Sequence, residues 1–134
     1  MLSQFTSADM LHHRIRKSWR RYVLPALLNH DADAMLAALV IADTSLDEVL
    51  RAEGCAGGTV GERIQHAMHT FSNYPALLAA RQTRNRVVHN LDCHLCLDEA
   101  GAALAAYQHA LWDHGVRLTN QLPGVGGRVG SCAA

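Results

Sequence analysis

Residues 81–90, Arg-Gln-Thr-Arg-Asn-Arg-Val-Val-His-Asn, bring together side chains that can act on phosphate. Arginine carries a permanent charge and a planar fork of donors that matches phosphate oxygens. Histidine titrates near neutral pH and can transfer protons. One group that moves a proton and one that neutralises charge on phosphorus can cleave a phosphodiester without a metal ion. Arg84, Asn85 and His89 are therefore the candidate catalytic residues.

These three side chains do not converge on one straight helix. At about 100° per residue, Asn85 and His89 share a face, whereas Arg84 and His89 lie about 140° apart. Either the helix frays near Asn90 or a second protomer supplies part of the site. The spacing therefore predicts a homodimer whose interface includes this helix and the one that follows it.

The elements that must position these residues are all predicted to be helices. Apolar residues recur at three- and four-residue steps, with breaks at Pro25, at the glycine-rich residues 54–58 and before Pro75. We expect an all-α, four- to five-helix antiparallel bundle over residues 1–122 and a flexible Gly-rich tail over 123–134. The predicted helices cover about residues 7–29, 31–54, 59–70, 75–90 and 98–118, with a kink or break at Pro25.

Composition narrows the class of protein. The chain has 134 residues, of which 49% are hydrophobic and 5% aromatic, which suits one domain of packed helices. No apolar run approaches the ~18 residues needed to span a membrane, and the N-terminus does not have the pattern of a signal peptide. We therefore expect a cytoplasmic protein, with no membrane association, whose four cysteines are reduced thiols.

Charge is distributed in blocks although the net charge is zero. Residues 1–30 carry five basic side chains and one acidic one, and residues 31–62 carry seven acidic side chains and one basic one. Within the first block Arg14, Lys17 and Arg21 share one helical face, where they could bind RNA phosphates together with Arg81. The alternative is a solvated face that pairs with the acidic second helix.

Two carboxylates of the second predicted helix are candidate partners of this site. Asp43 lies beside the apolar side of that helix, where an unpaired carboxylate would be costly. We expect it to hydrogen-bond Arg84, Arg86 or His89, with Asp47, one turn away, as a further partner. In the alternative, purely structural interpretation, the arginine only pairs with such an acid and His89 only caps its helix.

Residues 93–96, Cys-His-Leu-Cys, could supply three zinc ligands. A structural zinc site needs a fourth ligand, and no second Cys-x-x-Cys or His-x-x-x-His pair completes it. We therefore interpret the two cysteines as small, half-buried residues, and we predict no metal and no cofactor. A zinc-stapled helical adaptor remains a weaker hypothesis.

The stretch Arg84-Asn85-Arg86-Val87-Val88-His89 resembles the Arg-x4–6-His motif of HEPN domains, in which a polar residue often follows the arginine. The preceding segment, from Ala42 to Arg63, resembles the helices that precede the motif in a bacterial, stand-alone HEPN-like group. The helix after the motif also matches. The resemblance covers about residues 30–118.

The resemblance implies a metal-independent endoribonuclease that acts as a homodimer on single-stranded RNA, as a toxin or a defence effector. It assigns Arg84 and His89 as the catalytic pair, Asn85 as the residue that orients them, and the ribose 2′-OH as nucleophile. Asp43, Asp47 and Arg86 would support the pair. Other members of the family keep the fold without nuclease activity, so the alternative is a catalytically silent bundle that binds a protein or a nucleotide. Either function could involve a regulatory protein, such as a cognate antitoxin.

Overall fold

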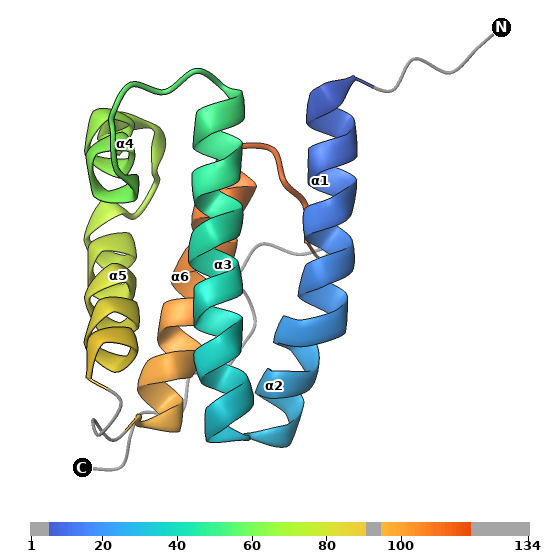
Figure 1. Ribbon diagram of the computed structural model, residues 1–134, viewed down its shortest axis with the longest axis vertical. Coiled ribbons are helices and arrows are strands. Elements are labelled where there is room, and N and C mark those ends of the chain that lie inside the picture. Colours follow the sequence, from blue (N-terminus) through green and yellow to red (C-terminus); the bar gives the residue numbers. More distant parts are fainter. Residues whose placement is uncertain (1–5, 91–94, 119–134) are drawn as a thin grey trace, which may run out of the picture.

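The computed structural model describes residues 6–90 and 95–118, and within them every regular element is a helix (Figure 1). The predicted all-α helical bundle is confirmed. None of the helices described is both long and apolar enough to cross a bilayer. The predicted tail, residues 123–134, lies outside the described residues. The elements are α1 (Ser7–Ser18), the π-helical turn η1 (Trp19–Val23), α2 (Leu24–Asn29), α3 (Ala32–Ala52), α4 (Val60–His66), the 3-10 turn η2 (Met68–Thr70), α5 (Tyr74–His89) and α6 (Leu97–Asp113).

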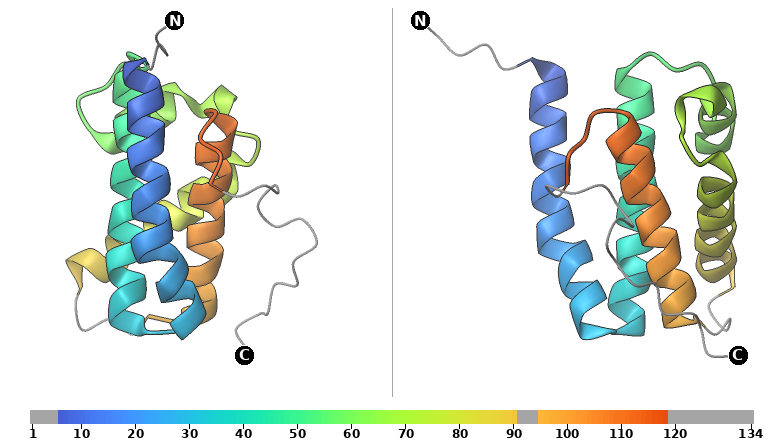
Figure 2. Two further views of the ribbon diagram at one scale, coloured as in Figure 1. Left: turned by 90° about the vertical axis from the view of Figure 1, so that its right-hand side faces the viewer. Right: turned by 180° about the vertical axis from the view of Figure 1, so that it is seen from behind.

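Helix α3 occupies the centre of the bundle. It contacts α1, η1 and α2 on one side, α4 and α5 on the other, and α6 behind (Figures 1 and 2). Consecutive long helices run in opposite directions, with α4 stacked on the upper end of α5. Consequently α1 and α5 lie at opposite edges of the molecule, and α5, which carries the candidate catalytic residues, packs against α3 and α6.

The predicted interruption at Pro25 takes the form of a π-helical turn. Proline has no amide hydrogen and cannot complete the α-helical ladder. The chain widens at η1, where the Leu24 N–H bonds to the carbonyl of Trp19, five residues back. Pro25 then stands in the first turn of α2, where no amide hydrogen is required. The break thus lies before the proline, and α1 continues into α2 with only a local change of geometry.

Side-chain caps set the starts of the next two helices. The Asp31 carboxylate accepts from the Asp33 N–H at the start of α3, and the Thr59 hydroxyl accepts from the Glu62 N–H at the start of α4. Helix α3 ends before Gly54, which adopts a positive φ of 78°. The helix predicted over residues 59–70 is shorter than expected, because α4 ends at His66 and is followed by the 3-10 turn η2.

Two glycines are expected to respond oppositely to alanine. Gly57 has φ +137°, and a Cβ there would lie 2.8 Å from the Arg63 backbone nitrogen, so Gly57→Ala should cost about 1–3 kcal/mol. Gly101 is helical, and a methyl group there would meet nothing within 4 Å, so Gly101→Ala should stabilise by about 1 kcal/mol. Urea unfolding of both variants checks this. Equal shifts of the same sign would contradict it.

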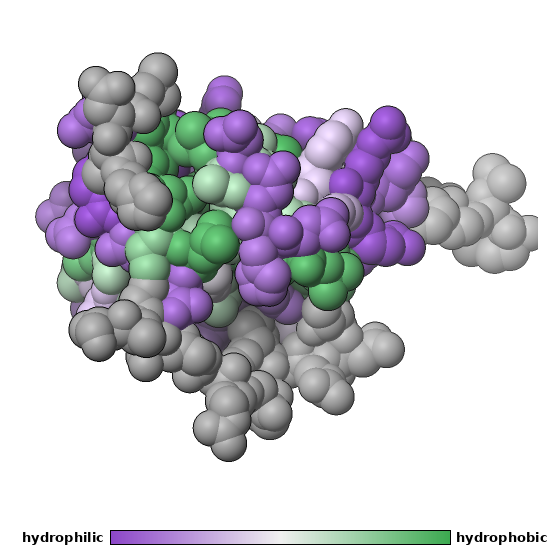
Figure 3. Space-filling model, turned by 90° about the horizontal axis from the view of Figure 1, so that it is seen from below, coloured by the Kyte–Doolittle hydropathy of each residue, from purple (hydrophilic) through white to green (hydrophobic). Residues whose placement is uncertain are grey.

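The lower end of the bundle exposes apolar side chains. Seen from below, a hydrophobic area lies in the middle of this surface (Figure 3). Leu28, at the end of α2, is 78% exposed, and an open pocket between α2, α3 and α6 is lined in part by Leu27, Met35 and Leu97. Because α5 also ends here, the apolar surface lies at the same end of the molecule as His89.

Candidate active site

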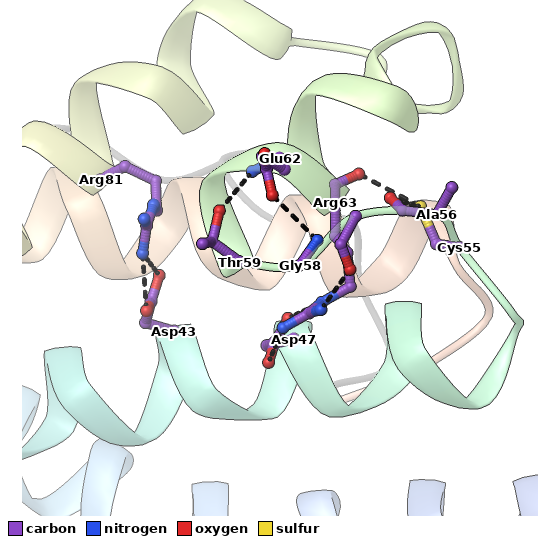
Figure 4. Close-up of polar contacts among 10 residues, drawn as sticks. Asp43, Asp47, Cys55, Ala56, Gly58, Thr59, Glu62, Arg63 and Arg81 are labelled. Carbon is purple, nitrogen blue, oxygen red and sulfur yellow. Dashed lines mark hydrogen bonds and ion pairs between the residues drawn. The ribbon is translucent and has the colours of Figure 1, made fainter.

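A buried carboxylate organises the site from the centre of the bundle. Asp43 on α3 is only 2% exposed. One nitrogen of Arg81, Nη1, donates to both of its oxygens at 2.7 and 2.8 Å, and the Tyr107 hydroxyl donates to Oδ1 at 2.8 Å. Figure 4 shows Arg81 reaching from α5 to Asp43. The cluster therefore joins α3, α5 and α6, because Tyr107 belongs to α6.

Arg84, one turn beyond Arg81, is held less tightly. Its Nε lies 3.5 Å from Oδ2 of Asp43, close enough for an ion pair but too long for a normal hydrogen bond. That Nε is buried and makes no hydrogen bond among the described residues. Nη1 donates to the Asn85 side-chain oxygen at 2.9 Å, and the side chain remains 21% exposed. Arg84 is thus anchored on its inner side and accessible on its outer side.

The charges of this cluster do not cancel. Asp43 supplies one negative charge and faces two guanidinium groups, which are always protonated in proteins. Arg81 makes the short contacts with the carboxylate, so the uncompensated positive charge falls mainly on Arg84. An arginine with this excess charge and an exposed edge can bind an anion such as a phosphate.

Tyr107 is kept protonated in the folded chain. Burial, and then the neighbouring Asp43 carboxylate, raise the pKa of the Tyr107 hydroxyl far above its ordinary value of 10.0. The phenol therefore remains a hydrogen-bond donor to Asp43 over the whole range in which the protein would function.

This raised pKa predicts a loss of stability at alkaline pH. Above pH 10.0 the unfolded chain releases the Tyr107 proton and the folded chain retains it, so folding becomes less favourable as pH rises. We expect the urea midpoint to fall more steeply above pH 10.0 in the parent protein than in Tyr107→Phe, which cannot ionise. Parallel midpoint curves for the two proteins would contradict this.

His89 stands apart from this cluster. It is the last residue of α5 and is exposed. The helix is regular up to this point, since the Asn90 N–H still bonds to the Arg86 carbonyl. Of the two alternatives, fraying of the helix before Asn90 is therefore not found, and the angle of about 140° between Arg84 and His89 persists. One protomer by itself does not direct both side chains at the same atom.

The acidic partners differ in part from those expected. Asp43 is buried, but its hydrogen bonds come from Arg81 and Tyr107, and in place of the expected hydrogen bond Arg84 forms an ion pair with it at 3.5 Å. The expectation that Asp47 supports Arg84 is wrong: Arg63 Nε and Nη2 bind its two oxygens at 2.6 and 3.1 Å (Figure 4). Arg63 Nη1 also donates to the Gly57 carbonyl at 2.8 Å. Asp47 therefore holds α4 and its preceding loop against α3.

The other basic residues proposed from the sequence lie in different environments. Arg86 forms an ion pair with Glu99 on α6, whereas Arg81 is committed to Asp43 and only 16% exposed. Arg81 is thus a buried ion-pair partner rather than an open contact for RNA. Lys17 and Arg21 are exposed on the far edge of the bundle, and Arg14 there pairs with Glu48 at 3.0 Å.

Sequence reasoning missed the roles of Tyr107 and Arg63. Tyr107 has the spacing of a core residue on α6, and nothing local indicates that its hydroxyl reaches α3. Arg63 follows the capping sequence of α4, where a basic residue is common. Both contacts join residues distant in sequence, so only the packing of the helices reveals them.

The cysteines do not share one state. Cys55 is a free thiol that donates to the Arg63 carbonyl at 3.2 Å. Cys96 is disulfide-bonded, so the prediction that all four cysteines are reduced is wrong for this residue. In this state Cys96 offers no thiolate to a metal. Cys93 and His94 lie outside the described residues, within which no cluster of three or more metal-ligating side chains occurs.

The candidate residues thus comprise an arginine held against the buried Asp43 and a histidine at the exposed end of the same helix. No protein-family model, curated protein or solved structure matches this chain.

Proposed function

We propose that this chain is a metal-independent endoribonuclease of the HEPN type, which acts on single-stranded RNA as a homodimer. The observation that carries the proposal is the excess positive charge at Arg84. A cation used only to neutralise Asp43 would be superfluous beside Arg81, which already contacts both carboxylate oxygens. The hydrogen bond from Arg84 to Asn85 leaves an edge of the Arg84 side chain exposed, and this edge is suited to binding a phosphate.

In the proposed reaction His89 takes the proton of a ribose 2′-OH, and the 2′ oxygen attacks the adjacent phosphorus. The new bond joins the 2′ oxygen to phosphorus, and the bond from phosphorus to the 5′ oxygen breaks. Arg84 stabilises the charge that develops on the phosphate oxygens. His89 of the partner subunit protonates the leaving 5′ oxygen. The products are a 2′,3′-cyclic phosphate and a 5′-OH.

The second protomer is required because Arg84 and His89 diverge within one chain. The apolar lower end of the bundle supports this arrangement, since it lies beside the end of α5 that carries His89. Covering that surface in a two-fold dimer would bring the two ends of α5 together, so that Arg84 of one protomer meets His89 of the other. A role as a toxin or defence effector, with a cognate antitoxin, is part of this proposal.

The test uses purified full-length protein, unstructured RNA and a matched DNA strand in excess chelator. The proposal expects RNA cleavage, intact DNA and products that end in a 2′,3′-cyclic phosphate. Light scattering at micromolar concentration should give twice the chain mass of 14.6 kDa. Activity only after magnesium is added, or a strict monomer that still cleaves, would refute the mechanism.

The second candidate is a catalytically silent helical bundle that binds another protein or a nucleotide. It is favoured by the ion pair of Arg84 with Asp43, which could serve solely to join α5 to α3. Complete lack of cleavage in chelator and in magnesium would support this candidate.

A further inference from the structure

The outer face of α1 and η1 carries a concentrated positive charge. Lys17, Arg20 and Arg21 are exposed and, with Met10 and Tyr22, belong to the lining of one open pocket. We call these three cations, together with Arg14 and His13 beside them, the α1 basic surface. It lies at the edge of the bundle opposite α5, with α3 between them (Figure 1). The surface is therefore separate from the Arg84 cluster.

Little of this charge is neutralised within the chain. In the part of the chain that the structure describes, the one acidic side chain paired with the α1 basic surface is Glu48, which binds Arg14. Several other acids of residues 31–62 have partners elsewhere: Asp43 and Asp47 pair with arginines, and Glu53 pairs with His114. Asp31 and Glu62 accept from backbone N–H groups. The alternative interpretation, in which this basic face pairs with the acidic helix α3, thus holds among these five residues for Arg14.

The π-helical turn contributes to this surface. Between the buried Trp19 and Val23, three consecutive residues, Arg20 to Tyr22, are exposed. Pro25 accounts for the interruption of the helix, and in the wider turn that results Arg20, Arg21 and Tyr22 are all exposed. The Arg21 guanidinium lies 5.6 Å from the centre of the Tyr22 ring. π-Helical turns are frequent at functional sites.

We infer that the α1 basic surface binds the sugar-phosphate backbone of single-stranded RNA, as an anchor separate from the catalytic residues. The choice of RNA rests on the proposed function. Lys17 and Arg21 are one helical turn apart, about 6 Å along the axis, a spacing comparable with that of neighbouring phosphates on an extended strand. Contacts of this kind read charge and backbone, and they give affinity without sequence preference.

An acidic protein fits this surface less well. Stable protein interfaces have an apolar centre that is depleted in charged residues, with charges at the rim. Here the two exposed large apolar residues, Met10 and Tyr22, stand twelve positions apart in the chain, and the exposed cations Lys17, Arg20 and Arg21 lie between them in sequence. Interfaces with nucleic acid are more positively charged than protein interfaces, as this surface is.

Binding is tested in the full chain carrying His89→Ala, so that RNA is not cleaved, by fluorescence anisotropy with a labelled RNA of about 20 nucleotides at several salt concentrations. Adding Lys17→Gln and Arg21→Gln should weaken binding at least tenfold. The slope of log K against log salt should fall by about 1.4, since each phosphate contact on a single strand contributes about 0.7. Single-stranded DNA of the same length should bind within about threefold of RNA.

The matched control is Lys17→Arg with Arg21→Lys, which keeps both charges and should keep both affinity and slope. Arg117→Gln, which removes an exposed charge outside this surface, should also bind as the parent does. Unchanged RNA binding after loss of Lys17 and Arg21 would overturn the inference. So would an acidic polyglutamate peptide that binds more tightly than RNA, which would indicate an acidic protein partner.

The two proposals fail in different ways. If the parent protein cleaves no RNA but the His89→Ala chain binds RNA through Lys17 and Arg21, the nuclease proposal fails and the anchor stands. If the parent cleaves RNA and loss of Lys17 and Arg21 changes neither binding nor the KM for a long substrate, the anchor fails and the nuclease stands. A raised KM with unchanged kcat supports both.

Discussion

Replacing His89 with alanine is expected to reduce RNA cleavage at least about 100-fold, because a general acid–base group contributes roughly 10²–10⁴ to the rate. The thermal midpoint should hardly change, since His89 is exposed at the end of α5. The measurement is the initial rate of RNA cleavage in chelator, with a thermal melt of the same preparation. Cleavage that persists in His89→Ala would leave the silent bundle as the better account.

Arg84→Lys tests the role of the second candidate catalytic residue, the Arg84 guanidinium. Lysine keeps the positive charge but loses the planar fork, so the rate should still fall steeply if the guanidinium binds two phosphate oxygens. The fold should survive, because Arg81 continues to neutralise Asp43. A lysine variant with the parent rate would show that only the charge matters, against the role proposed for the guanidinium.

Asp43→Ala is expected to destabilise the protein by about 3–5 kcal/mol, the cost typical of breaking a buried ion pair by removing one partner. The change leaves Arg81 and Arg84 facing each other without a counter-charge and removes the acceptor of the Tyr107 hydroxyl. Urea unfolding measures the effect. A loss below about 1 kcal/mol, the level of a surface pair, would mean that the cluster does not hold the helices together.

Two controls separate charge from packing in this cluster. Tyr107→Phe removes one hydrogen bond and should cost only about 1 kcal/mol. The double variant Asp43→Ala/Arg81→Ala should be less destabilised than the sum of the single variants, because the second change removes one of the two uncompensated cations. Simple additivity would contradict direct coupling between Asp43 and Arg81.

The local elements of this fold were predictable because the interactions that set them lie within a few residues. Asp31 and Thr59 cap the helices that follow them, and the glycine-rich segment at Gly54 separates α3 from α4. Pro25 removes one amide hydrogen, which required an interruption nearby, although the π-helical form of that interruption was not predictable. The burial of Asp43 was also predictable, because the helical periodicity places it beside apolar residues.

The pairing of charges depended on tertiary structure. Asp43 and Asp47 are one turn apart on the same helix, and the sequence offers both to the same arginines. The packing of α3 against α4 and α5 sends Asp47 to Arg63 and Asp43 to Arg81, with Tyr107 of α6 completing the cluster. Contacts between residues 16, 38 and 64 positions apart depend on the rotation and offset of whole helices. By itself the sequence determined which residues could do chemistry and which helices carry them. The packing decided that Arg81 neutralises the core while Arg84 keeps an exposed edge, because the relative placement of α3, α5 and α6 gives the short contacts with Asp43 to Arg81 and Tyr107 and leaves Arg84 Nε 3.5 Å away.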